Sequence, residues 1–359
     1  MADFWQIPLV DLLSLTKEQL ADELERLGQP GYRAGQLCNW IYQRRAKDFE
    51  EMTDLPSVLR AGFAERFALR PLSKVKETGS EDSTRKFLFR LSDGQMIETV
   101  LIPASPALYG ERSDRRTVCI SSQVGCAYGC KFCASGLDGL KRNLTAGEIV
   151  AQFLAVEEVS QEKINNIVFM GMGEPFANYP NLMQAIGILN APWGIGLGAR
   201  SMTVSTSGLV PRIRNFADQP LQVRLAISLH GATDAVRGKI MPVNRRYPLG
   251  ELLDACEHYC SRKSQRITFE YILIRGVNDT DEQAHALAGH ARRLRAKVNL
   301  IPYNNVEGLD WERPALLVQE RFLNHLKAQG VSATLRREKG HDIAAACGQL
   351  RLQSLRRAA

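Results

Sequence analysis

Apolar and polar positions follow a helical period in the first part of the chain. Thr16 stands three residues before a glutamine, Leu20 and Leu24 follow on one helical face, and Gly28 comes after them. A hydroxyl residue followed three positions later by an amide is a helix-start pattern, and glycine often follows the last turn. We therefore predict a helical domain over residues 1–70, acting as a solvated basic cap or as an RNA-contacting module. A second helix is expected to bury Leu37, Trp40 and Ile41.

The next segment, residues 71–104, has the period of β-strands. Apolar-rich runs over residues 86–90 and 96–102 flank Ser92 and the dipeptide Asp93-Gly94. Asp-Gly between two such runs is typical of a tight hairpin turn. A small β-hairpin unit is therefore expected here.

From residue 105 to 359, short β-rich runs alternate with helical patterns. The runs cover residues 116–121, 166–170, 202–206, 222–229, 266–274 and 297–302. Six strand–helix units predict an α/β fold, with a parallel sheet curled into an incomplete (βα)6 barrel. In such sheets, functional groups gather at the carboxyl ends of the strands.

Composition narrows the class of protein only modestly. Of the 359 residues, 45% are hydrophobic and 24% are charged, as in ordinary globular proteins. The formal charge of +7 favours a polyanionic partner without proving one. The sequence contains neither an apolar run long enough to span a membrane nor a signal-peptide pattern at its start. We therefore expect a cytoplasmic protein with no membrane partner.

Three closely spaced cysteines dominate the candidate chemistry. Cys126, Cys130 and Cys133 form a Cys-x3-Cys-x2-Cys run. Three thiolates can hold three irons of a 4Fe–4S cluster and leave the fourth iron open for a small molecule. Zinc is the competing interpretation, but a second pair of ligands does not follow in the sequence. A disulfide framework belongs to short secreted chains.

Polar residues also end several of the predicted strands. Gly171-Met-Gly-Glu-Pro175 follows one strand, and its glycines allow close backbone approach to a ligand. Taken singly, each polar residue could be a turn residue or a structural histidine. Several such strand ends beside one cysteine loop instead predict a shared ligand site. The strand-end segments are residues 171–175, 203–208, 226–230 and 299–304.

The remaining cysteines divide into two groups. Cys119 lies in the first predicted barrel strand, and Cys347 lies between small residues near the carboxyl terminus. Either could be an inert buried thiol, although a loop of small residues suits Cys347 to a crowded site. Cys38, Cys256 and Cys260 are interpreted as packing residues.

The chain resembles one family through several motifs together. These are Cys119-Ile-Ser-Ser-Gln-Val-Gly-Cys126, the cysteine run, Gly171-Met-Gly-Glu-Pro175, Ser228-Leu-His230 and Ala346-Cys-Gly-Gln-Leu350. They resemble the dual-specificity radical S-adenosylmethionine (SAM) RNA methyltransferases. Members of that family methylate carbon 2 of adenosine in large-subunit ribosomal RNA and in certain tRNAs.

The resemblance implies a reaction with two cysteines and two SAM molecules per turnover. One SAM methylates Cys347, and a second, bound at a 4Fe–4S cluster, is cleaved reductively to a radical. That radical activates the methyl group, which adds to the adenine carbon. Cys119 then releases the RNA by forming a Cys119–Cys347 disulfide, and Glu98 accepts the ring proton. The resemblance also implies that seven residues contact SAM: Gly173, Glu174, Ser205, Ser228, Leu229, His230 and Asn304. We further expect an electron donor such as a flavodoxin-type reductant, and a monomeric protein.

Two other functions stay open from the sequence. One is the related adenine carbon-8 enzyme that confers ribosomal antibiotic resistance, and the other is a zinc-containing RNA-binding module. RNA contact is expected from basic residues near the predicted site, since phosphates attract them. These residues are Arg112, Arg115, Arg116, Lys131, Lys141, Arg142, Arg245 and Arg246.

Overall fold

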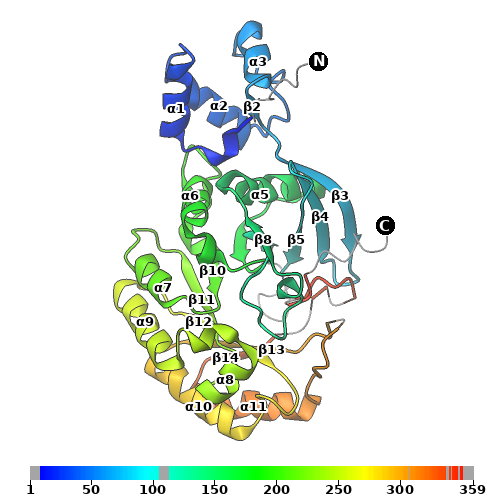
Figure 1. Ribbon diagram of the computed structural model, residues 1–359, viewed down its shortest axis with the longest axis vertical. Helices are drawn as coiled ribbons and strands as arrows, with labels where there is room; N and C mark the ends of the chain where they lie inside the picture. Colours follow the sequence, from blue (N-terminus) through cyan, green and yellow to red (C-terminus); the bar gives the residue numbers. More distant parts are fainter. Residues whose placement is uncertain are drawn as a thin grey trace.

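The computed structural model shows a helical unit above a strongly curved sheet that carries helices on its outer face (Figure 1). It describes residues 9–104, 113–306, 308–336, 339–340, 342–346 and 348–350. Arg112 and Cys347 therefore lie outside the described residues.

The amino-terminal unit is helical, as the pattern predicts. The capping box at Thr16 is present: the Gln19 amide donates to Thr16 Oγ1 at 3.2 Å, and the Thr16 amide donates to Gln19 Oε1 at 2.9 Å. Gly28 follows the first helix with a φ of +69°, a backbone conformation that favours glycine. The helices are α1 (Lys17–Arg26), α2 (Arg33–Cys38) and α3 (Ser57–Ala64).

A π-helical turn, η2 (Asn39–Gln43), continues α2 directly. Leu37, Trp40 and Ile41 are buried, so the expected apolar face of this second helix is confirmed. The π turn itself has no simple sequence pattern, because it adds one residue to a helical turn without changing composition.

Ten strands form one mixed sheet that runs through most of the chain. They are β3 (Leu72–Gly79), β4 (Arg85–Leu91), β5 (Met96–Pro103), β6 (Arg116–Cys119), β9 (Asn166–Phe169), β10 (Met202–Thr206), β11 (Arg224–Ser228), β12 (Thr268–Leu273), β13 (Lys297–Pro302) and β14 (Ala333–Leu335). Their spatial order is β14-β13-β12-β11-β10-β9-β6-β5-β4-β3.

All six predicted barrel strands are present, and neighbours from β6 to β14 pair in parallel. The predicted hairpin is also present as the antiparallel pair β4–β5. It is part of the main sheet, because β5 pairs antiparallel with β6 and places Val100 opposite Cys119. The short strand β14 was not predicted.

Helices between the parallel strands cover the outer face of the sheet (Figure 1). They are α5 (Ala146–Ser160), α6 (Tyr179–Asn190), α7 (Val210–Ala217), α8 (Asp234–Ile240), α9 (Leu249–Arg262), α10 (Asp281–Arg293) and α11 (Leu316–Ala328). The main apolar core lies between these helices and the sheet and continues into the amino-terminal unit. It contains Cys256 in α9 and Cys38 in α2, as expected for packing residues. Within the described residues, no helix is both long and apolar enough to cross a membrane.

The helical unit is joined to the barrel at the start of α5. A short strand, β1 (Val10–Asp11), pairs with β2 (Phe67–Ala68) and leads into the 3-10 turn η1 (Leu12–Ser14). Ser14 Oγ accepts from the Gly147 amide at 2.9 Å, and a side chain at Gly147 would clash with Asp11. The contact therefore requires glycine in the first turn of α5.

Candidate active site

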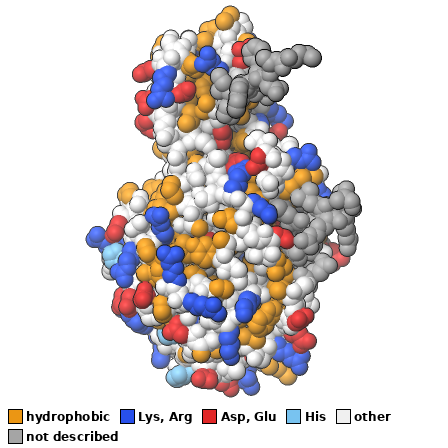
Figure 2. Space-filling model, in the orientation of Figure 1, with side chains coloured by type: hydrophobic (Ala, Val, Ile, Leu, Met, Phe, Trp, Pro, Cys, Tyr) orange, Lys and Arg blue, Asp and Glu red, His pale blue; other side chains and the backbone are white. Residues whose placement is uncertain are grey.

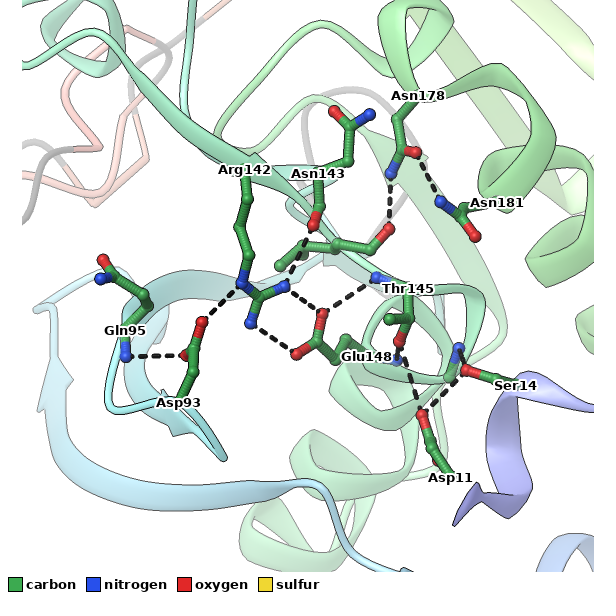
Figure 3. Close-up of polar contacts among 12 residues, drawn as sticks. Asp11, Ser14, Asp93, Gln95, Arg142, Asn143, Thr145, Glu148, Asn178 and Asn181 are labelled. Carbon is green, nitrogen blue, oxygen red and sulfur yellow. Dashed lines mark hydrogen bonds and ion pairs between the residues drawn. The ribbon is translucent and has the colours of Figure 1, made fainter. Parts of the chain in front are cut away.

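The loop that carries the three neighbouring cysteines is closed at its base by two short strands. These are β7 (Gln123–Gly125) and β8 (Leu140–Asn143), which pair antiparallel. Arg142 on β8 forms hydrogen-bonded ion pairs with Glu148 at 2.7 Å and with Asp93 in the β4–β5 turn at 2.6 Å (Figure 3). Glu148 also completes the capping box of α5 with Thr145. This polar network fixes the ends of the cysteine loop relative to the sheet.

Cys126, Cys130 and Cys133 line one cavity at the carboxyl ends of the strands. Burial is the main reason that the pKa of the Cys126 thiol is raised to about 12, and the neighbouring Cys133 and Glu174 contribute to this shift. Cys130 has a raised pKa for the same main reason, burial, with added repulsion from the other two cysteines. Three half-buried thiols that repel one another as thiolates need a positive centre to be stable in that form.

The donor set fits an iron–sulfur cluster. Three soft thiol ligands face a single cavity, and the remaining lining groups leave one side open to a ligand. The described part of the chain contains no group of three or more His, Cys, Asp or Glu side chains arranged to hold a single metal ion.

The Gly-Met-Gly-Glu-Pro segment forms the wall next to the cysteines. A side chain at Gly171 would lie 2.7 Å from the Ser121 amide nitrogen, and Gly173 has a φ of +97° with Gln123 against it. These contacts explain why both positions need glycine. Glu174 is buried and accepts from the amides of Ser207 at 2.7 Å and Phe176 at 3.0 Å. Burial nevertheless raises the pKa of its carboxyl.

Hydroxyl and imidazole groups form the adjoining wall. Ser205 on β10 and Ser228 on β11 have their Oγ atoms 3.3 Å apart, and both line the cavity. His230 Nδ1 accepts from the Ile272 amide at 3.0 Å. Burial, with the charge of Arg237, lowers the pKa of His230 to about 3. The imidazole is therefore neutral and carries its proton on Nε2, which makes that atom a donor.

Two of the seven predicted SAM contacts do not line this cavity. Leu229 is buried in the core, and its backbone N–H and C=O bond to Glu270 O and Arg237 Nε. Asn304 is also buried, and its Oδ1 accepts from Arg313 Nη2 at 3.1 Å. The structure brings the other five together: Gly173, Glu174, Ser205, Ser228 and His230.

Several cavity residues were missed by the sequence reasoning. Phe132 lies in the cysteine loop and packs edge-on against His230, with ring centroids 4.6 Å apart. The others include Tyr128, Met241, Glu270, Ile272 and Ile301. Apolar residues within a strand or loop give no sign of which face they occupy. Glu270 was detectable in principle, because a lone acid inside an apolar strand run is unusual.

The second cysteine region lies beside the first. Cys119, at the end of β6, is buried against Val100, Met172 and Ala345. Glu98 on β5 is buried and forms an ion pair with Lys86, with Nζ 3.0 Å from Oε1. Glu98 is therefore not a surface acid.

The segment on either side of Cys347 is held from two directions. Lys86 Nζ donates to Ala344 O at 3.1 Å, and the Gly340 amide donates to Asp82 Oδ2 at 2.8 Å. Beyond position 347, Gly348 O accepts from the Ala134 amide of the cysteine loop at 2.7 Å. Gly348 also lines the cavity with the three cysteines. The two described flanks thus lead from Cys119 to the cysteine loop.

The described basic residues proposed for RNA contact fall into two sets. Arg116 and Arg142 form ion pairs with acids of the same chain, and Arg115 Nε donates to Thr117 Oγ1 at 3.3 Å. Lys131, Lys141, Arg245 and Arg246 are exposed. Figure 2 shows Lys and Arg side chains spread over the front of the barrel next to apolar ones.

Two known families match separate segments of the chain. Residues 120–288 match the Radical SAM superfamily, and residues 10–69 match the Ribosomal RNA large subunit methyltransferase N-terminal domain.

Curated relatives match over nearly the full chain. "Probable dual-specificity RNA methyltransferase RlmN 3" of Opitutus terrae is 54% identical, covering 94% of this chain and 93% of its own. "Probable dual-specificity RNA methyltransferase RlmN" of Akkermansia muciniphila is 49% identical, covering 96% of each chain. The crystal structure of a radical SAM methyltransferase from Sphaerobacter thermophilus matches with a TM-score of 0.90 at 49% identity, covering 96% of this chain and 99% of that one.

Proposed function

Because the chain belongs to the RlmN family of radical SAM RNA methyltransferases, we propose that it methylates carbon 2 of adenosine in large-subunit ribosomal RNA and in tRNA. One observation carries the proposal. The cluster cysteines and Gly348, which follows Cys347, line one cavity, and Ala345 on the other side of Cys347 packs against Cys119. A domain that only bound SAM would not need a second pair of cysteines, Cys119 and Cys347, beside the cavity of the cluster cysteines.

Cys126, Cys130 and Cys133 would hold the 4Fe–4S cluster, and the residues at the neighbouring strand ends would bind SAM. Together the two cofactors supply one-electron reductive cleavage of a carbon–sulfur bond. The protein's part is to bind and orient. Gly173 permits close backbone approach, and His230 offers an N–H donor, while the hydroxyls of Ser205 and Ser228 can both donate and accept.

Cys347 is the methyl carrier in this proposal and Cys119 the thiol that resolves the RNA-bound state. Attack of the Cys119 thiolate on the sulfur of residue 347 forms the S–S bond and breaks the bond from that sulfur to the new carbon substituent. The electron pair of that bond passes to the substituent, which becomes the methyl group after protonation. External thiols then reduce the disulfide. The burial of Cys119 against Ala345 supports this assignment.

Glu98 is the proton acceptor for the adenine ring hydrogen. Its carboxylate is held by Lys86, which also contacts the backbone of Ala344. One lysine therefore links the base to the segment that leads to Cys347. Such shared support keeps the base and the carbon donor in a constant relation.

Further features of the reaction follow from the same proposal. The RNA target places the enzyme in the cytoplasm, where a flavodoxin-type donor supplies electrons and the enzyme acts as a monomer. The exposed Lys131, Lys141, Arg245 and Arg246 are candidate phosphate contacts.

Nucleoside analysis tests the proposal directly. The protein is reconstituted anaerobically with iron and sulfide and incubated with SAM, reductant and unmodified ribosomal RNA or tRNA. Mass spectrometry of the digested RNA should show 2-methyladenosine. Detection of 8-methyladenosine would assign the chain to the carbon-8 activity instead. Cleavage of SAM with no modified nucleoside in either RNA would contradict the proposed substrate.

A further inference from the structure

Glu270 is a buried acid in the cavity that the proposed reaction has not used. It lies on β12 and is 5% exposed. Its Oε1 accepts from Asn299 Nδ2 on β13 at 2.9 Å. Its Oε2 is buried and has no hydrogen-bond partner among the described residues. An unpartnered buried carboxylate oxygen costs free energy, so its retention needs a reason.

A row of polar side chains crosses the sheet at this level. Ser228 is the register partner of Glu270, and Glu270 is the register partner of Asn299. Ser205 Oγ lies 3.3 Å from Ser228 Oγ at one end, and Thr334 Oγ1 donates to Asn299 Oδ1 at 3.2 Å at the other. The side-chain polar atoms named in this row lie within hydrogen-bonding distance of a neighbouring hydroxyl or amide. Glu270 Oε2 is the exception.

The cavity wall beside this row is apolar. Phe132, Met241, Ile272 and Ile301 line it. A ligand with a flat ring system and a hydroxyl-bearing sugar matches both surfaces, because the ring can pack on the apolar wall while hydroxyls reach the row. A carboxylate accepts hydrogen bonds and cannot donate them, so it requires a donor on the ligand.

Resting on the proposed function, we propose that Glu270 is a further SAM-binding residue, whose Oε2 accepts a hydrogen bond from a ribose hydroxyl. Ser205 and Ser228 then bind the same sugar from the adjacent strands. The Asn299 amide holds the carboxylate in place, and Arg336 adds a favourable charge near it. Burial raises the pKa of Glu270, and a hydroxyl donor would stabilise its ionised form.

The test measures binding to the reconstituted protein, not turnover. S-adenosylhomocysteine is the probe, because it carries the same nucleoside and amino acid and has no methyl group to transfer. Its dissociation constant is measured by calorimetry for the wild type and for Glu270→Gln, which keeps an oxygen for Asn299. Loss of a hydrogen bond to a charged group should weaken binding about tenfold or more. The 2′-deoxy or the 3′-deoxy form of the probe should bind the wild type more weakly by a similar factor, yet bind Glu270→Gln almost as well as the intact probe.

Two controls keep the outcomes separate. Thr334→Val changes the same polar row away from the cavity and should leave binding unchanged, and the cluster absorbance of each variant reports on cluster loading. The Gln variant removes an unpartnered buried charge, so its melting temperature without ligand should not fall.

Two results would overturn the assignment. They are equal affinity of both proteins for the probe, and undiminished discrimination against both deoxy forms in the variant. Failure of the wild type itself to bind the probe would instead contradict the proposed function.

Discussion

In the proposed reaction, release of the methylated RNA depends on the thiol of Cys119. With alanine at this position, the transfer to RNA should proceed but its release should not, because no thiol remains to attack the sulfur of Cys347. Cys119→Ala should therefore accumulate a covalent protein–RNA species, visible as a shifted band on a denaturing gel. Cys256→Ala is the matched control: it removes a buried thiol in α9, away from the cavity. A Cys119→Ala protein that turns over without any shifted band would refute the resolving role.

Burial of the Asp11 carboxyl makes the stability of the folded protein depend on pH. Burial raises its pKa to about 6 from 3.8, although Ser14 and the Leu13 amide donate hydrogen bonds to it. The folded state therefore binds a proton more tightly than the unfolded state does. The contribution of Asp11 to stability is most favourable below about pH 4 and is lost as pH rises to about 6.

Replacing the Asp11 carboxyl should remove this dependence of stability on pH. In Asp11→Asn, the difference in unfolding free energy from the wild type should shift in favour of the variant as pH rises from 4 to 6.5. Denaturant titrations at pH 4.5 and pH 7 measure it. A difference that is constant across that range would show that Asp11 titrates normally.

Individual site residues were predictable where a spacing or a local motif identified them. Cys126, Cys130 and Cys133 share a cavity as expected, and the glycines of the Gly-Met-Gly-Glu-Pro segment have contacts that exclude side chains. Lys86 was not predictable, because its importance comes from neighbours on other strands. Pairing across a sheet depends on register, which a single sequence does not reveal.

The element that most directly controls the cysteine loop is β8. Arg142→Met should leave Glu148 buried without its main cation and destabilise the protein by about 3 kcal/mol. Arg262→Met is the matched control, since its ion pair with Asp218 is exposed and should contribute much less to stability. Unfolding midpoints in urea measure both. Equal effects of the two substitutions would mean that the network in Figure 3 is no stronger than a surface pair.

The β4 strand controls the segment before Cys347 through Lys86. Lys86→Met should remove the bond to Ala344 and release the segment, so that hydrogen exchange at the Ala345 and Ala346 amides rises about tenfold. Lys74→Met on β3 removes an exposed ion pair with Glu77 and should leave those amides unchanged. Unaltered exchange in Lys86→Met would show that the hairpin does not restrain the segment.

For helices and strands, the sequence pattern predicted well which elements are present. It predicted poorly which strands pair with each other. The capping boxes at Thr16 and Thr145 and the hairpin turn at Asp93-Gly94 are all present. The pairing of β5 with β6 could not be predicted, since strand neighbours across a loop have no local pattern. β14 has only three residues, too few for a recognisable period.

For the whole molecule, the charge distribution predicts how RNA binds. Arg245→Glu combined with Arg246→Glu should weaken RNA affinity and reduce the slope of log affinity against log salt by about two, one for each lost phosphate contact. Arg224→Glu reverses a charge that is equally exposed but lies at the amino end of β11, so its slope should be unchanged. Filter binding across a salt series measures all three proteins. Identical slopes would place the RNA on another face.

The loop around residues 339–350 touches both the β3–β5 hairpins and the cysteine loop. Ribosomes make the chain from its amino end, so these contacts form after every other part of the site has emerged. Until that moment, this segment does not cover the three cluster cysteines, and their side of the cavity is open to iron and sulfide. The order of synthesis thus favours metallation before enclosure, and a chain released early would carry a cluster site that stays open.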